Sequence, residues 1–115
     1  MQKLINQLIR CTGLAETPIR IYLATLELGQ ASIQQIAKKS AVKRTSIYNF
    51  LPILIQMGLI LETSKKRRKV YSAMDPHQLF EHTKAKMNEL ESLLPELSAL
   101  NNSQISKPRV TYFEG

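Results

Sequence analysis

The sequence predicts a mainly α-helical protein with one small β-hairpin and a long helix towards its C-terminal end. Three observations carry this prediction. Apolar residues recur at intervals of three and four in four segments before residue 58, which is the spacing of helices with one buried face. Two short extended segments then flank a run of basic residues. From Pro76 to Leu100, the apolar residues return to a helical spacing.

The chain length and composition set the size and setting of the protein. Its 115 residues, 43% of them hydrophobic, fit one domain whose core needs neither disulfides nor metal. The single cysteine, Cys11, cannot form an internal disulfide and lies in an apolar helical pattern, so we expect it to be buried. The polar residues among the first ten are unlike a secretory signal, and the apolar stretch 51–61 is too short to span a membrane. We therefore expect a cytoplasmic protein without a membrane partner.

The first two predicted helices each end at a glycine. Residues 2–11 form the first, which Thr12 and Gly13 terminate. The second begins between Glu16 and Pro18, because proline suits a first helical turn, and it ends at Gly29. Their apolar stripes comprise Leu4, Ile5, Leu8 and Ile9 in the first helix and Ile19, Tyr22, Leu23 and Leu26 in the second.

A third and a fourth helix follow at close spacing. Ser32 and Gln35 match a capping box, which predicts the start of a short helix that ends near Ser40. A longer helix then runs to Gly58, with its core-facing residues at helical spacing: Ile47, Phe50, Leu51, Leu54 and Ile55. Two helices joined by so short a break predict a helix-turn-helix.

The extended segments after the helix-turn-helix predict a β-hairpin. Residues 59–63 and 70–72 are the strands, and residues 64–69 are the connection. The connection contains no Asn-Gly or Asp-Gly pair, so the prediction depends on its position after the helix pair. Together these elements predict a winged helix-turn-helix domain over residues 1–74.

A C-terminal helix is predicted over residues 75–101, with Asp75 as its cap and Pro76 in its first turn. We expect Pro95 to kink this helix or to end its regular part near Leu94. Its heptad seam predicts a homodimer; the alternative is that the helix folds back to complete its own core with the first helix. Residues 102–115 are expected to be a tail. The expected dimerisation residues are Phe80, Met87, Leu90, Leu94 and Leu97.

Positive charge is concentrated in one part of the sequence. The formal net charge is +7, yet residues 31–74 alone contain nine Lys or Arg against one acid, Glu62. The formal charges of the two flanking regions therefore sum to about zero. A local basic surface is typical of proteins that bind a polyanion, because each cation near a phosphate releases condensed counterions.

The predicted contacts to nucleic acid lie on the fourth helix and the hairpin. In the helix, over about residues 43–57, Arg44 suits guanine and Asn49 suits adenine, while short polar side chains more often bind phosphates. The basic run has no interleaved aromatic residue, which favours duplex phosphates over stacked single strands. We therefore predict sequence-specific binding of double-stranded DNA as a transcription regulator, with the helix in the major groove and the wing on the backbone or in the minor groove. The candidate residues are Lys43, Arg44, Thr45, Ser46, Tyr48, Asn49, Lys65, Lys66, Arg67, Arg68 and Lys69.

The segments LAETPIRIY, IAKKSA, RTSIY and MGLI resemble the TrmB-like winged-helix transcription regulators over about residues 2–100. The resemblance implies the same DNA-reading helix and wing, and sugars as effectors, although the residues themselves identify no effector ligand. The terminal KPRVTYFEG resembles the lead-in to an effector domain.

The sequence departs from the family pattern at three positions. Ala15 replaces a capping Thr, so the second helix would begin late, at Thr17. Ala41 replaces a glycine, which implies either no positive φ or a small strain. Pro52 should kink the fourth helix.

Other functions have little support in the sequence. Among only four glycines there is no phosphate-binding loop, and His77 and His82 are five residues apart without accompanying carboxylates or thiols. We therefore expect no enzyme, no metal and no cofactor. The alternative is a winged-helix protein-interaction adaptor, which would expose apolar or acidic residues on the fourth helix and wing. RNA binding is a further and less favoured alternative.

Overall fold

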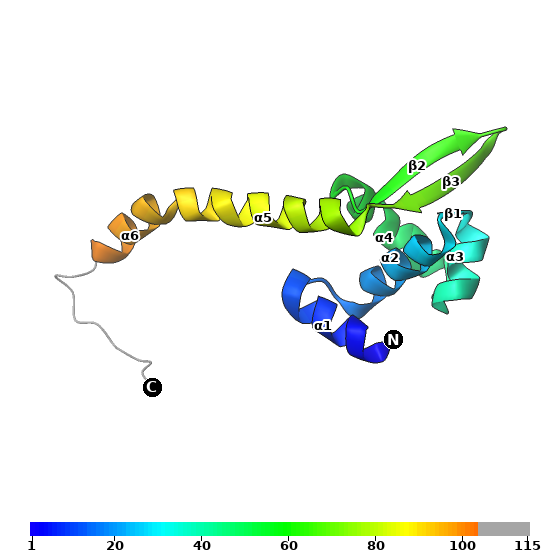
Figure 1. Cartoon of the computed structure of the whole chain (residues 1–115), viewed down its shortest axis with the longest axis horizontal. Helices are drawn as coiled ribbons and strands as arrows, with labels where there is room; N and C mark the ends of the chain where they lie inside the picture. The colour runs from blue at the N-terminus through cyan, green and yellow to red at the C-terminus, as the bar shows by residue number, and fades with distance from the viewer. Residues whose placement is uncertain (104–115) are drawn as a thin grey trace. The chain divides into compact units, whose positions relative to one another are not determined.

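The computed structural model describes residues 1–103 (Figure 1). The described residues divide into two units, residues 1–79 and residues 80–103, which are considered separately below. The expected resemblance of KPRVTYFEG to a lead-in lies outside the described residues. The elements in order are α1 (Gln2–Thr12), α2 (Glu16–Leu28), β1 (Gln30–Ala31), α3 (Ile33–Ser40), α4 (Arg44–Gln56), β2 (Ile60–Lys65), β3 (Arg68–Ala73), α5 (Pro76–Ser92) and α6 (Leu94–Asn102).

The core of the first unit is built around α2. This helix contacts α1, α3, α4 and the sheet, and it buries side chains on most of its surface. The hydroxyl of its buried Thr25 donates a 2.7 Å hydrogen bond to the Ile21 carbonyl oxygen and is therefore paired. Burial of each large apolar side chain stabilises the fold by about 1.5–3 kcal/mol. The fully buried residues include Ile21, Ile36, Ile47, Leu54 and Ile60, one or more from each of four elements.

The helix-turn-helix has the predicted capping box. The Ser32 hydroxyl accepts a hydrogen bond from the Gln35 backbone N–H, and the Gln35 side chain accepts one from the Ser32 N–H. In the turn, the Ser40 hydroxyl accepts a 3.2 Å hydrogen bond from the Val42 N–H. Ala41 has a φ of 61°, so the turn uses the left-handed region and contains the small strain that was one of the two expected alternatives.

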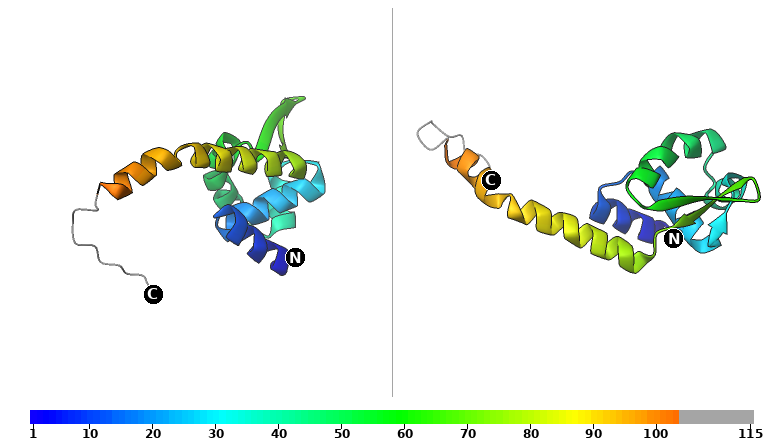
Figure 2. Two further views of the ribbon diagram at one scale, coloured as in Figure 1. Left: turned by 60° about the vertical axis from the view of Figure 1, so that its left-hand side comes forward. Right: turned by 90° about the horizontal axis from the view of Figure 1, so that it is seen from above.

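The sheet has three antiparallel strands in the order β1-β3-β2, with β2 and β3 extending as one hairpin (Figure 2). β1 was not predicted, because two residues are too few to show a periodic pattern. The predicted strands also ended too far from the turn. Lys65 pairs with Arg68, so the strands are joined by a two-residue turn and not by the predicted six-residue connection. Both turn residues, Lys66 and Arg67, have positive φ, as a type I′ turn requires, although neither is Gly or Asn.

Two local expectations were wrong. Cys11 is exposed, because it lies about 120° around α1 from the buried Ile5, which faces the core. Helix α2 begins at Glu16, which confirms the predicted start between Glu16 and Pro18, while the late start at Thr17 implied by Ala15 was wrong. Its N-cap Ala15 has an extended backbone and makes no side-chain capping hydrogen bond. Helix α4 continues through Pro52 to Gln56, and the kink expected there stays a prediction.

The C-terminal helical region consists of two helices rather than one. The Asp75 carboxylate accepts a 3.0 Å hydrogen bond from the His77 N–H at the start of α5, as expected of a cap. Helix α5 ends at Ser92, and Pro95 lies in the first turn of α6, which confirms that the regular helix ends near Leu94. None of the helices within residues 1–103 has the length and apolar character needed to cross a membrane.

Candidate nucleic-acid interface

The N-terminal end of α4 concentrates positive charge. Its N-cap, Lys43, makes no side-chain capping hydrogen bond, and its first turn contains no acidic residue. A helix N-terminus already has a partial positive charge, and the side chains of Lys43 and Arg44 add to it. Such an end is destabilised by its own charges and is stabilised by a bound anion such as phosphate.

The outward face of α4 presents most of the predicted contact residues. Ile47, Leu51 and Leu54 are buried and Phe50 packs partly against the core, so the opposite side of the helix faces solvent. Ser46 is half-buried and is the least accessible of the predicted set. Of the predicted set on this helix, Arg44, Thr45, Tyr48 and Asn49 are exposed, and Lys43 is exposed at its start.

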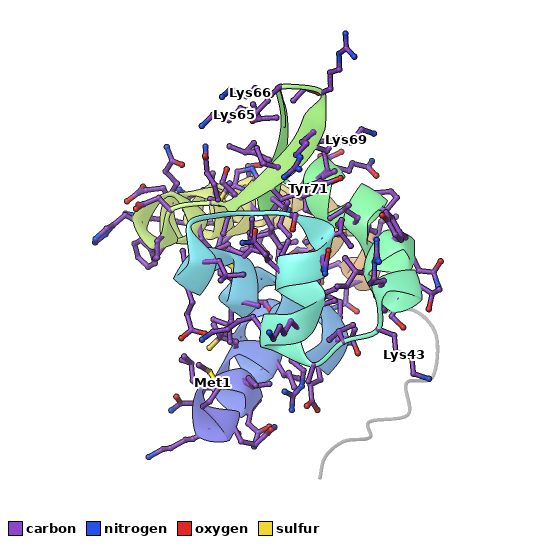
Figure 3. The ribbon with its side chains drawn as sticks, turned by 90° about the vertical axis from the view of Figure 1, so that its right-hand side faces the viewer. Met1, Lys43, Lys65, Lys66, Lys69 and Tyr71 are labelled. Carbon is purple, nitrogen blue, oxygen red and sulfur yellow. The ribbon has the colours of Figure 1, made fainter. Side chains whose placement is uncertain are left out.

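All five basic residues of the hairpin are exposed, but they occupy different places on it. Figure 3 shows Lys65 and Lys66 at the free end, with Lys69 and Tyr71 nearer the helices. Lys69 is also ion-paired, because its Nζ lies 3.2 Å from Oε2 of Glu62 on the neighbouring strand.

A groove of about 840 Å³ lies between the helix-turn-helix and the hairpin. Four basic side chains from three elements line it: Lys38 of α3, Arg44 of α4, and Arg68 and Lys69 of β3. The structure therefore brings part of the predicted set into one site. The predicted residues outside the lining are Lys43, Thr45, Ser46, Asn49, Lys65, Lys66 and Arg67.

Several groove residues were not among the predicted contacts. Lys38 belongs to the basic segment, and Gln34 and Gln35 begin the first helix of the motif, so their position relative to the recognition helix was a usable signal. Tyr71 gave no such signal, because its sequence context is that of an ordinary buried strand residue.

Tyr71 forms part of the groove lining while its ring remains almost wholly buried. Its hydroxyl donates a 3.4 Å hydrogen bond to Oε2 of Glu62. Burial raises the pKa of Tyr71 above its usual value of 10.0, and the nearby charge of Glu62 and the hydrogen bond to it raise that pKa further. The hydroxyl therefore remains protonated at neutral pH and serves as a hydrogen-bond donor.

The chemistry of this surface is that of binding. It offers cations, amides and hydroxyls, which match phosphate oxygens and base edges. Within residues 1–103, no group of three or more His, Cys, Asp or Glu side chains is arranged to hold a metal ion.

Comparison with known proteins identifies the first unit. The family model described as "Sugar-specific transcriptional regulator TrmB" matches residues 8–77, which is more than half of the chain. An uncharacterized protein of Methanocaldococcus jannaschii is 39% identical over 67 residues. That alignment covers 57% of this chain and 52% of the relative, so the matched part spans about half of the relative's length.

Solved structures share the winged-helix fold at low sequence identity. A MarR family transcriptional regulator of Silicibacter pomeroyi superposes with a TM-score of 0.54 at 23% identity, covering 87% of this chain and 72% of that protein. The transcriptional regulator BldR of Sulfolobus solfataricus gives 0.53 at 19% identity, covering 93% and 84%. These likenesses confirm the predicted fold class.

Proposed function

Because the chain belongs to the TrmB family of sugar-specific transcriptional regulators, we propose that it binds double-stranded DNA sequence-specifically to regulate transcription. In this proposal, α4 enters the major groove and the β2–β3 wing contacts the backbone or the minor groove. The observation that supports it most directly is the groove in which cations of α3, α4 and β3 meet.

The spatial order of the charges fits a duplex. Arg44 and Tyr48 line the groove from α4, while Arg68 and Lys69 line it from the hairpin. A backbone strand between them would receive phosphate contacts from both sides, and the exposed Asn49 would remain available to a base edge. This role requires binding alone, so we propose a protein that is not an enzyme and uses no cofactor.

We further propose that the protein acts as a homodimer through the C-terminal helices. Neither helix buries a residue, and the large apolar side chains from Phe80 to Leu100 are between 42% and 68% exposed. Burying such a seam between two copies would stabilise each large side chain by about 1.5–3 kcal/mol. The two winged-helix units of a dimer would also contact a DNA site long enough for specificity in a genome. The seam comprises Phe80, Met87, Leu90, Leu94 and Leu97.

One observation favours the adaptor as a second candidate. Ile53 on α4 and Leu61 on β2 are exposed apolar side chains, which was the property expected of a protein-binding surface. They lie outside the basic groove, which favours DNA as the occupant of the groove itself. A regulator of this kind would act in the cytoplasm.

The proposal is tested with a duplex selected from a random pool by repeated binding. Fluorescence anisotropy then compares this duplex with a shuffled duplex, the single strand and the matching RNA over a series of salt concentrations. We expect the selected duplex to bind at least 10³-fold more tightly than the shuffled one, with a linear fall of log affinity against log salt. Equal affinity for all four nucleic acids, or no binding to any of them, would refute sequence-specific duplex binding and favour the adaptor.

A further inference from the structure

Glu62 is an acid placed inside an otherwise basic surface. It is the only acidic residue in the segment 31–74. On β2 it is the register partner of Tyr71, and its carboxylate contacts two groove residues, the Lys69 ammonium at 3.2 Å and the Tyr71 hydroxyl at 3.4 Å. Glu62 is not part of the groove lining, but its carboxylate contacts two residues of the groove at which DNA phosphate is expected.

The ion pair is poorly suited to a purely structural role. The Lys69 side chain is 68% exposed and that of Glu62 is 33% exposed, so solvent screens much of their attraction. Pairs of this kind contribute little to folding, and a phosphate can displace the carboxylate at small cost. The Tyr71 hydroxyl holds the carboxylate from a second side and so keeps it next to Lys69 when no DNA is bound.

We propose that Glu62 is a specificity-determining residue, because its carboxylate occupies Lys69 in place of a DNA phosphate. This inference rests on the proposed function. Binding to random duplex depends on phosphate contacts, so one sequestered cation weakens it directly. In the specific complex, base contacts of α4 hold a phosphate close enough to Lys69 to displace the carboxylate, whereas on random duplex Lys69 stays paired with Glu62, so the carboxylate weakens random binding more. Since specificity is a difference between two affinities, the carboxylate increases it by acting against the wrong DNA.

The test compares Glu62→Gln with Glu27→Gln. Both raise the net charge by one, the amide at residue 62 can still accept the Tyr71 hydrogen bond, and Glu27 lies in a different cleft between α1, α2 and α3. We expect Glu62→Gln to steepen the salt slope on random duplex by about 0.9, which makes its gain about threefold greater at 50 mM than at 200 mM salt. The ratio of specific to random affinity should fall. Glu27→Gln should leave both quantities close to those of the wild type.

A second pair of variants tests whether Glu62 changes the salt slope through Lys69. In a Lys69→Gln background, adding Glu62→Gln should change the slope no more than Glu27→Gln does, because the cation it would release is gone. Circular dichroism melts establish that each variant is folded.

The outcomes separate this inference from the function on which it rests. If the wild type binds duplex and Glu62→Gln behaves as Glu27→Gln, Lys69 is not sequestered and the inference is wrong while the proposed function stands. If the effect of Glu62→Gln persists without Lys69, the carboxylate acts by repelling DNA phosphates directly, and the proposed mechanism is wrong. Failure of the wild type to bind duplex at any salt concentration would overturn both.

Discussion

The Tyr22 hydroxyl on α2 donates a 2.7 Å hydrogen bond to the backbone carbonyl oxygen of Met74, the residue that follows β3. The Tyr22 ring is buried in the core, and burial, with a smaller effect of the Asp75 charge, raises the pKa of its hydroxyl above 10.0. Met74 also donates its N–H to the Leu59 carbonyl oxygen at 2.8 Å. The end of the wing is therefore tied both to the central helix and to the segment after α4.

Removing this hydroxyl should destabilise the winged-helix unit. Tyr22→Phe keeps the ring and leaves the Met74 carbonyl oxygen without its side-chain donor, a change that costs about 1–2 kcal/mol. The melting temperature should fall by about 4–8 °C for each kcal/mol. Thermal and urea unfolding followed by circular dichroism measure the change, with Tyr48→Phe on the exposed face of α4 as the control. Equal stabilities of the two variants would contradict the structural role of the bond.

Ala41→Gly should stabilise the protein. The φ of 61° at Ala41 is costly for a residue with a Cβ, whereas glycine adopts it readily. After the greater backbone entropy of glycine in the unfolded chain is subtracted, we expect a gain of about 0.5–1 kcal/mol. The control, Ala37→Gly in the interior of α3, should lose a similar amount. Urea unfolding midpoints decide the question, and a loss at both positions would show that the turn does not need the left-handed conformation.

The two turn residues of the wing should trade stability against DNA binding. Lys66→Asn with Arg67→Gly supplies the residues that a type I′ turn favours, so the hairpin should become more stable. The same change removes two cations and should lower the salt slope by up to about 0.9 for each lost phosphate contact. Lys84→Asn with Lys86→Asn on α5 removes the same charge elsewhere. If both double variants shift the slope equally, the wing tip does not touch DNA.

The recognition helix should determine sequence preference. Arg44→Ala and Asn49→Ala should each cost about 1–3 kcal/mol on the selected duplex and much less on a shuffled one, because base contacts distinguish the two. Gln56→Ala, exposed at the far end of α4, is the control and should change neither affinity. A uniform loss on both duplexes would make Arg44 and Asn49 backbone contacts.

The dimer prediction concerns the apolar seam. Leu90→Lys with Leu94→Lys should give a monomer that stays folded, because both side chains are exposed in the single chain. Asn88→Lys with Ser92→Lys adds the same charge to exposed polar positions and should remain dimeric. Light scattering over a range of concentrations measures the mass. A wild type that is monomeric at high micromolar concentration would refute the proposal.

The sequence by itself determined the four helices before residue 58 and the concentration of basic residues in the segment 31–74. Ile47, Leu51 and Leu54 had to face one direction because a helix advances 100° for each residue, and the Ser32 and Gln35 capping box needs only residues three apart. These relationships are local, and a linear pattern contains them in full. The wing was predicted from the position of its extended segments directly after the helix pair, because its turn contains no Asn-Gly or Asp-Gly pair.

The tertiary structure decided which distant residues share a site. Strand β1 forms because Ala31 pairs with Tyr71, forty residues later in the sequence. Two residues are too few to show a periodic pattern, so the strand could not be predicted. The same packing joins Lys38 and Arg44 to Arg68 in one groove and places the Glu62 carboxylate against Lys69. Exposure of Cys11 was likewise decided by which side of α1 meets the core. Such contacts depend on the register and packing of separate elements, so they are set only when the chain has folded.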